Sequence, residues 1–208
     1  MSEKYKSIVA FYESCFDKHG DCPKGHDWPV LSDLVRRYEV MLGVILDSTK
    51  KPTLLDFGCG TAMFYEHIQK TRQNMGIQYS GLDLSPKFIE TARKKHSEVS
   101  FYCFDILKYP DSLKSYNYIT LNGVFTEKID LSFNEMLDYF KRMLITIFPK
   151  VEVGFAFNVM AKHVQWEKEN LFHLPLDTLA DFLASKLTRN FVIRNDYGLY
   201  EYTVYVYK

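Results

Sequence analysis

The chain has 208 residues, of which 47% are hydrophobic and 25% are charged, with 26 basic side chains against 26 acidic ones. A domain of this size buries roughly 70% of the surface that its unfolded chain exposes, so it needs no disulfide or metal to form a core. The formal net charge of zero produces no overall field that attracts a polyanion, which disfavours DNA or RNA as the partner.

The four cysteines, Cys15, Cys22, Cys59 and Cys103, form no C-x-x-C pair and no cluster with histidines at the spacing of zinc ligands. We interpret them as reduced thiols and expect no metal site. The first 20 residues contain too short an apolar run for a signal peptide, and no stretch is long and apolar enough to cross a membrane. These features predict a cytoplasmic protein with no membrane partner.

The first 50 residues have helical spacing. Apolar residues recur at three- and four-residue intervals over 5–16 and 31–46, which predicts two helices that pack over the edge of a sheet or close a site. From about Lys51 the pattern changes to short apolar runs separated by amphipathic segments, as in a parallel sheet covered by helices. We therefore expect one domain over 1–208, with a helical lid at 1–50 and a Rossmann-like core at 51–208.

Seven strands and four further helices are predicted in this core. The strands are 53–57, 78–83, 100–104, 116–121, 151–157, 190–195 and 201–207, and the helices are 62–71, 86–96, 134–148 and 176–187. Ser85 supplies an N-cap before Pro86, which suits the first position of a helix because its missing N–H would have no partner there. The last two strands are joined by only residues 196–200, too few for a crossover, so we expect an antiparallel hairpin.

The clearest chemical signal is residues 54–62, LLDFGCGTA, where a buried strand runs into a glycine turn and then a helix. Glycines are used where the backbone turns tightly and approaches a ligand without a side chain in between. The free N–H groups of such a turn, with the positive end of the following helix, suit a nucleotide-like ligand. A sharp turn without a ligand is the alternative interpretation.

Two further predicted strands also lead into a carboxylate. Asp83 ends strand 78–83, where it could accept hydrogen bonds from both ribose hydroxyls of an adenosine ligand. Asp105 follows strand 100–104, where it could accept from the exocyclic amine of adenine while Leu84 and Ile106 enclose the ring. The alternative for Asp105 is that it caps the next turn. With the acid of the first strand, three neighbouring strands have acidic tips.

These motifs resemble those of the class I S-adenosylmethionine (SAM) dependent methyltransferases. The resemblance covers about residues 51–208 and rests on LLDFGCGTAMF, YSGLDLSPKFIETARKK, FYCFDIL and YNYITLNGVFTEK as the first to fourth motifs. The N-terminal HGDCPKGHDWPVLSDLVRRYEVML also looks like the start of small bacterial methyltransferases. The antiparallel hairpin agrees with the seven-stranded sheet of this family. The resemblance therefore implies a SAM-dependent methyltransferase with SAM as its cofactor.

The resemblance also implies roles for individual residues. The turn would hold the methionine end of SAM, Asp83 the ribose and the third strand the adenine. The implied cofactor-binding residues are Arg37, Asp56, Gly58, Cys59, Gly60, Asp83, Leu84, Asp105, Ile106 and Asn122. Arg37 is included because a guanidinium suits the cofactor's carboxylate, with Arg36 as its competitor and an exposed helix face as the alternative. Asn122 falls where the fourth strand of the family lines the methyl-transfer cleft.

The sequence departs from the family pattern at two positions. Ala62 stands where the first motif usually has a third glycine, a change small enough to keep the helix close to the strand. The fourth motif reads Asn122-Gly123-Val124-Phe125 and lacks the Asn-Pro-Pro-Tyr pattern of methyltransferases that act on amino groups of nucleic acids. This departure weakens the case for base methylation.

Methyl transfer needs no covalent enzyme nucleophile, because it depends on holding the two reactants in line. A base is needed only for a hydroxyl or a protonated amine as acceptor, and His163 is the candidate, with His26 as the second. Structural roles remain open for both histidines. Aromatic and polar side chains near the open ends of the strands are candidates for the acceptor pocket, with core packing as their alternative role: Tyr12, Trp28, Phe125, Asn158, Trp166, Tyr197 and Tyr200.

We therefore expect a SAM-dependent methyltransferase that modifies an oxygen or nitrogen of a small polar acceptor, a sugar or another metabolite being candidates. His163 and Asn122 are the expected catalytic residues. The alternatives are a nicotinamide-dependent oxidoreductase, which would need a third glycine where Met63 stands, and a catalytically inactive SAM-binding protein that acts through partners. The sequence does not define the acceptor or the oligomeric state.

Overall fold

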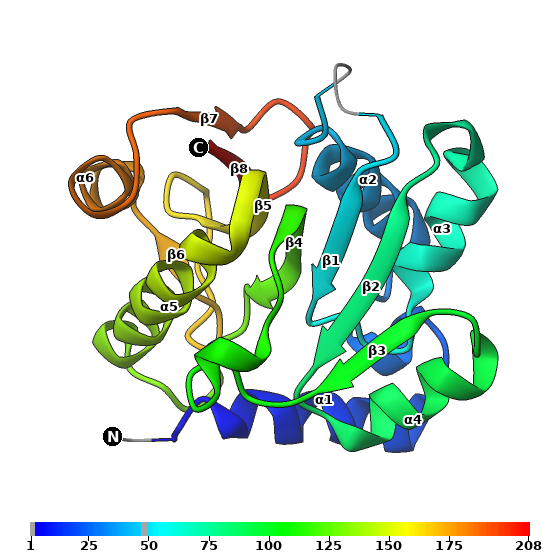
Figure 1. Ribbon diagram of the computed structural model, residues 1–208. Helices are drawn as coiled ribbons and strands as arrows, with labels where there is room; N and C mark the ends of the chain where they lie inside the picture. Colours follow the sequence, from blue (N-terminus) through cyan, green and yellow to red (C-terminus); the bar gives the residue numbers. More distant parts are fainter. Residues whose placement is uncertain (1–2, 47–49) are drawn as a thin grey trace.

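A mixed sheet with helices on both faces forms the centre of the computed structural model, which describes residues 3–46 and 50–208 (Figure 1). Residues 1, 2 and 47–49 of the expected lid segment lie outside the described residues. The strands are β1 Thr53–Phe57, β2 Gln78–Asp83, β3 Ser100–Cys103, β4 Tyr116–Phe125, β5 Val151–Ala161, β6 His173–Leu174, β7 Phe191–Arg194 and β8 Glu201–Tyr207. Their order is β3-β2-β1-β4-β5-β8-β7, with β6 paired to β5 off this path.

Six α-helices and four short 3₁₀ helices accompany the sheet within the described residues. The α-helices are α1 Lys6–His19, α2 Leu31–Leu42, α3 Met63–Thr71, α4 Pro86–Lys95, α5 Phe133–Ile147 and α6 Leu176–Lys186. The 3₁₀ helices are η1 Pro23–His26, η2 Gln73–Met75, η3 Pro110–Ser112 and η4 Phe148–Lys150. None of these helices is long and apolar enough to span a membrane.

Two hydrophobic clusters on opposite faces of the sheet hold the layers together. Alternate strand residues point to opposite faces, so Leu54 belongs to one cluster and Leu55 to the other. The cluster of Leu55 includes the apolar faces of α5 and α6, and the cluster of Leu54 includes those of α2, α3 and α4. The sheet is therefore buried on both sides, and a ligand can reach it only at the ends of its strands.

The predicted α/β fold is confirmed. The strands β1 to β5 run parallel, and β8 pairs antiparallel with both β5 and β7, so the C-terminal hairpin is present as expected. Ser85 caps α4, because its hydroxyl accepts from the backbone N–H of Phe88 at 3.2 Å. Each predicted strand and helix is observed, with small shifts at most ends.

Two strands are longer than expected, and one strand was not predicted. β4 and β5 each continue four residues beyond the predicted ends at 121 and 157, because they pair with each other as far as Phe125↔Val159 and β5 pairs with β8 as far as Met160↔Glu201. The short β6 forms only where the chain folds back beside the end of β5. Two residues are too few to give a periodic signal. These extensions determine where several predicted site residues lie.

Candidate active site

The carboxyl ends of β1, β2, β3 and β4 lie at one edge of the sheet, and α1 runs across this edge (Figure 1). Three hydrogen bonds join the helix to the strand ends. The hydroxyl of Tyr5 donates to Oδ2 of Asp105 at 2.5 Å, the hydroxyl of Ser85 donates to Glu13 at 2.5 Å, and the hydroxyl of Tyr12 lies 3.5 Å from the carbonyl oxygen of Gly123. The N-terminal segment therefore covers the tips of several strands.

Two adjoining cavities lie beneath this segment. The larger encloses about 110 Å³ and is lined by Tyr5, Ile8, Val9, Tyr12, His26, Trp28, Phe57, Gly58, Gly60, Asp83, Leu84, Phe88, Asn122, Gly123, Val124 and Tyr139. The smaller, of about 40 Å³, adds Asp56, Cys59 and residues of α2 and α3. Five residues line both cavities and mark their junction: His26, Trp28, Gly58, Gly60 and Asn122.

The glycine turn after β1 forms one wall of both cavities. Gly58 and Gly60 have φ angles of 75° and 53°, a left-handed conformation that glycine adopts without steric cost. A Cβ atom at Gly58 would lie 2.7 Å from Val124, so the close approach also requires glycine. Ala62, at the position of the expected third glycine, is also left-handed, with a φ of 70°. The turn therefore keeps the glycine-type backbone despite the alanine.

Two carboxylates at the strand ends have raised pKa values. Asp56 is 3% exposed, and burial raises its pKa to about 7 although Tyr79 donates a hydrogen bond to it at 2.7 Å. Asp83 accepts from the backbone N–H groups of Gly60 and Ser85, both at 2.9 Å. Burial raises the pKa of Asp83 to about 6. Neither carboxylate forms an ion pair with a basic side chain of the described residues.

Asn122 presents an unpaired acceptor to the same space. The register between β4 and β5 shifts between Leu121 and Phe125, and Gly123 within this irregularity has a φ of 78°. Such bulges redirect side chains and are common beside active sites. The Oδ1 atom of Asn122 is buried without a hydrogen-bond donor, and it is the one such side-chain atom within the described residues. A ligand with a donor group would satisfy it.

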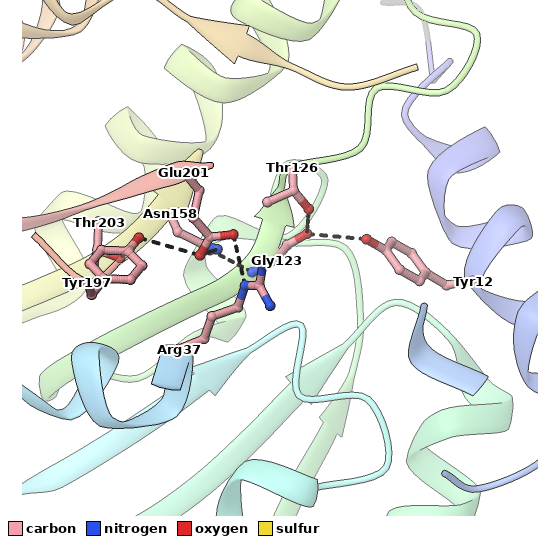
Figure 2. Close-up of polar contacts among 8 residues, drawn as sticks. All are labelled: Tyr12, Arg37, Gly123, Thr126, Asn158, Tyr197, Glu201 and Thr203. Carbon is pink, nitrogen blue, oxygen red and sulfur yellow. Dashed lines mark hydrogen bonds and ion pairs between the residues drawn. The ribbon is translucent and has the colours of Figure 1, made fainter. Parts of the chain in front are cut away.

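A buried polar network holds the irregular part of β4 that contains Gly123 (Figure 2). Nε of Arg37, on α2, donates to Oε2 of Glu201 at 2.8 Å, and Oε1 of Glu201 accepts from Nδ2 of Asn158 at 2.9 Å. Oδ1 of Asn158 accepts in turn from the backbone N–H of Gly123 at 2.7 Å. The Arg37 guanidinium also lies 4.5 Å from the ring centre of Trp28. The network therefore links α2 and β8 to the cavity wall.

Most of the predicted cofactor residues lie at the cavities. Gly58, Gly60, Asp83, Leu84 and Asn122 line the larger one, and Asp56 and Cys59 line the smaller one. The other three line neither cavity. Arg37 is held by Glu201, Asp105 is bonded to Tyr5, and Ile106 is 1% exposed within the core. Both oxygens of Asp105 accept hydrogen bonds, because Oδ1 receives the backbone N–H of Leu107.

The predicted acceptor pocket is only partly assembled. Tyr12 and Trp28 line the larger cavity, but Phe125 is fully buried and packs against Phe140 at a ring distance of 5.0 Å. Asn158 is fully buried within the polar network. Phe125 and Asn158 lie inside the sheet because β4 and β5 extend beyond their predicted ends.

The remaining predicted residues lie away from the cavities. The hydroxyl of Tyr197 bonds to Thr203 at 2.9 Å, so it completes the buried network. Trp166 packs against Tyr200 at a ring distance of 4.9 Å. His163 is exposed in the segment after β5 and lines neither cavity, whereas His26 lies at their junction. His26, the second candidate for a base, is thus the histidine that the fold brings to the site.

Sequence reasoning missed four aromatic residues of the larger cavity, Tyr5, Phe57, Phe88 and Tyr139. Tyr5 and Tyr139 stack with ring centres 4.9 Å apart and an interplanar angle of 12°. Tyr5 precedes α1 and Tyr139 lies on α5, so no local sequence pattern could reveal this contact. Within the described residues, no group of three or more His, Cys, Asp or Glu side chains is arranged to hold a metal ion.

Comparison with known proteins relates the chain to methyltransferases. Residues 55–144 match a family model described as a methyltransferase domain. A Mycobacterium tuberculosis protein described as a candidate methyltransferase, Rv1506c, is 21% identical over 79% of this chain and 98% of its own length. The malonyl-[acyl-carrier protein] O-methyltransferase 1 of Ilyobacter polytropus is 35% identical over 38% of this chain but only 29% of its own length.

A solved structure supports the same fold. The magnesium protoporphyrin IX methyltransferase of Synechocystis PCC 6803, crystallised with bound SAM, superposes with a TM-score of 0.67. The comparison covers 100% of this chain and 98% of that one at 14% sequence identity, so it bears on the fold alone.

The raised pKa of Asp56 predicts how stability depends on pH. Its folded-state pKa of about 7 lies above the unfolded value of about 4, so its contribution to stability is full below pH 4 and is lost as the pH rises toward 7. Between pH 5 and 7, the free energy of unfolding of the ligand-free protein should fall more steeply than that of Asp56→Asn, by on the order of 1 kcal/mol per pH unit. Urea unfolding at several pH values measures the difference.

The comparison between the two proteins isolates Asp56 from the other groups that titrate. Burial lowers the pKa of His26 to about 4, so its contribution has the opposite sign and is lost as the pH falls below 6.5. That contribution is present in both proteins and cancels. Parallel pH profiles would show that Asp56 is an ordinary carboxylate.

Proposed function

Because the chain is a class I SAM-dependent methyltransferase, we propose that the two cavities bind SAM and that a methyl group is transferred there to an oxygen or nitrogen of a small polar acceptor. The larger cavity, beside Asp83 and Leu84, would take the adenosine. The smaller cavity, beside Asp56 and Cys59, would take the methionine end. The sulfur would then lie near their junction.

This proposal rests on two acceptor groups of the smaller cavity: one lacks a positively charged partner, and the other lacks a hydrogen-bond donor. Asp56 is a buried carboxylate without a basic partner in the described residues, and Oδ1 of Asn122 is a buried acceptor without a donor. Burying a charge or a polar group without a partner is costly, so a ligand that brings a positive charge and N–H donors is favoured. The ammonium group of SAM has both properties.

The remaining residues of the site have roles that fit an adenosine. Asp83 is oriented by the N–H groups of Gly60 and Ser85, which leaves lone pairs of both oxygens for ribose hydroxyls. The glycine turn brings the backbone close to the ligand without a side chain. Leu84, Phe57 and Tyr139 provide apolar surface in the same cavity.

When bound, SAM supplies an electrophilic methyl group on a positively charged sulfur. The protein residues would bind and orient the reactants and exclude water, because alignment alone lowers such barriers by roughly 7–11 kcal/mol. We propose that the segment 1–50 acts as the lid, since α1 and the preceding Tyr5 contact the tips of three strands, and Tyr5 and Tyr12 line the cavity. We expect an acceptor that binds beneath this segment to be small.

The same charges disfavour a nicotinamide cofactor. The pyrophosphate of NAD is negatively charged and would lie beside the glycine turn, where Asp56 and Asp83 already carry raised pKa values. Among the residues that the structure describes, no basic side chain lines either cavity apart from the neutral His26. The site therefore favours a cation over a dinucleotide.

Substitution of Asn122, whose Oδ1 lacks a donor, tests the proposal that the cavities bind SAM. Asn122→Ala should bind SAM about tenfold more weakly, the effect of losing one hydrogen bond to a charged group. Asn122→Asp, which keeps an oxygen at this position, should retain the affinity. Isothermal titration calorimetry measures both, with Asn134→Ala on α5 as the control and NAD as a ligand that should not bind. Equal affinities for all the variants would contradict the role of Asn122.

Transfer of a labelled methyl group tests the acceptor class. The purified protein is incubated with SAM labelled in its methyl group and with a cell extract separated into small molecules, proteins and nucleic acids. Label should enter the small-molecule fraction, and Asp83→Ala should abolish it. Label in protein or nucleic acid would contradict the acceptor class. SAM binding without any transfer would favour an inactive SAM-binding protein.

A further inference from the structure

His26, at the end of η1, is held in a fixed position where the two cavities meet. The residue is 8% exposed. Its ring stacks on Phe88 of α4 with ring centres 4.9 Å apart, and it forms a T-shaped contact with Phe16 of α1, with ring centres 6.3 Å apart. Packing against both rings leaves the imidazole little freedom to rotate, so the directions of its two nitrogens are set by the fold.

Hydrogen bonds to the glycine turn determine which nitrogen carries the proton. Oγ1 of Thr61 lies 2.5 Å from Oδ1 of Asp21 and 3.0 Å from Nε2 of His26. The hydroxyl has one proton, and an ionised carboxylate can only accept, so Thr61 donates to Asp21. Thr61 must then accept from His26, which places the proton on Nε2. Nδ1 is left with a free lone pair.

The charge of Asp21 supports this assignment. Burial raises the pKa of Asp21, but the hydrogen bonds from Lys95 and Thr61 outweigh that effect and lower it overall. Nζ of Lys95, on α4, lies 2.8 Å from Oδ2 of Asp21. Asp21 is therefore ionised at neutral pH. In this chain of hydrogen bonds His26 donates to Thr61, and Thr61 donates to Asp21.

Nδ1 of His26 faces the glycine turn. A Cβ atom built on Gly60 would lie 2.7 Å from Nδ1 and 2.6 Å from Cε1 of the ring. Within the described residues, Nδ1 has no hydrogen-bond donor, and His26 lines both cavities. Gly60 also donates its N–H to Asp83, so the His26 ring and the carboxylate assigned to the ribose both lie beside this glycine.

The imidazole is neutral at physiological pH. Burial lowers the pKa of His26 to about 4, Asp21 opposes this effect and Lys95 adds to it. A neutral ring suits a site for a cationic ligand, because an imidazolium beside it would repel the positive charge. It also keeps the lone pair of Nδ1 available as an acceptor.

We propose that His26 is a cofactor-contacting residue whose Nδ1, oriented by the relay through Thr61 to Asp21, accepts a hydrogen bond from a hydroxyl or ammonium donor of the bound cofactor. This inference rests on the proposed function, which places the cofactor at the cavity junction. Thr61 and Asp21 are positioning residues in this arrangement. Closure of the N-terminal segment thereby completes the cofactor site, because His26 comes from that segment.

Calorimetric titration with S-adenosylhomocysteine, the demethylated form of SAM, tests the contact at pH 7.5. His26→Phe keeps a ring on Phe88 but removes both nitrogens, and it should bind about tenfold more weakly than the wild type. The matched control His163→Phe, on an exposed histidine, should bind as the wild type does. Thr61→Val should weaken binding by disturbing the relay, and Thr61→Ser should restore it.

A measurement on the wild-type protein makes the test independent of these variants. The ¹⁵N resonances of the His26 ring distinguish a protonated nitrogen from one with a free lone pair. In the ligand-free protein, Nε2 should be the protonated nitrogen. Addition of S-adenosylhomocysteine should shift the Nδ1 resonance as it accepts a hydrogen bond, while Nε2 remains protonated.

The outcomes distinguish a failure of the inference about His26 from a failure of the proposed function. If the wild type binds the ligand, but His26→Phe binds equally well or the Nδ1 resonance does not move, the inference about His26 is overturned and the proposed function stands. If the wild type does not bind S-adenosylhomocysteine, the proposed function itself fails. Should His26→Phe not fold, the nitrogen resonances alone decide.

Discussion

The burial of Asp56 without a positive partner is the constraint on which the site depends. Asp56 is the next-to-last residue of β1, and its two hydrogen bonds, from Tyr79 at 2.7 Å and Thr120 at 3.4 Å, do not prevent its pKa from rising to about 7. An ion buried in this way is unfavourable until a cation joins it. Asn122 adds a second unmatched acceptor at the same place. The ligand-free protein therefore carries an electrostatic cost that a cationic cofactor relieves.

The N-terminal segment converts an open sheet edge into an enclosed site. Polar groups of this segment bond to the tips of β2, β3 and β4 and to the glycine turn, through Glu13, Tyr5, Tyr12 and Asp21. On the other side of the cavity, the ion pair of Arg37 with Glu201 fixes α2 to β8. Because Glu13, Tyr12 and Asp21 bond to the strand tips and the glycine turn, which would surround a ligand, cofactor binding and closure are expected to be coupled.

The fold, and the clustering of the residues that are proposed to bind the cofactor, could be predicted from the sequence because their signals are local. A glycine turn after a buried strand, and a carboxylate at the end of the next strand, are each contained within a few residues, and Gly58, Gly60 and Asp83 lie together as the parallel arrangement requires. The acceptor half depends on long-range pairing. The pairing of β5 with β8 is what carries Asn158 into the core, and no pattern around residue 158 indicates it.

The two histidines considered as candidate bases, His163 and His26, show the same limit of prediction from local sequence. His163 follows a predicted strand and so is placed near the site by simple topology, yet it is exposed in the structure. His26 reaches the cavity only because η1 folds back onto the glycine turn of a strand more than 30 residues away. The stacking of Tyr5 on Tyr139 has the same origin.

The most direct test of the central claim is the number of protons released when SAM binds. Calorimetric titrations at pH 6.5, in two buffers with different enthalpies of ionisation, give this number from the difference in heat. If a cation pairs with Asp56, its pKa falls on binding and the wild type should release protons, whereas Asp56→Asn should release fewer. Binding of SAM with the same heat in both buffers, and hence without proton release, would contradict the account.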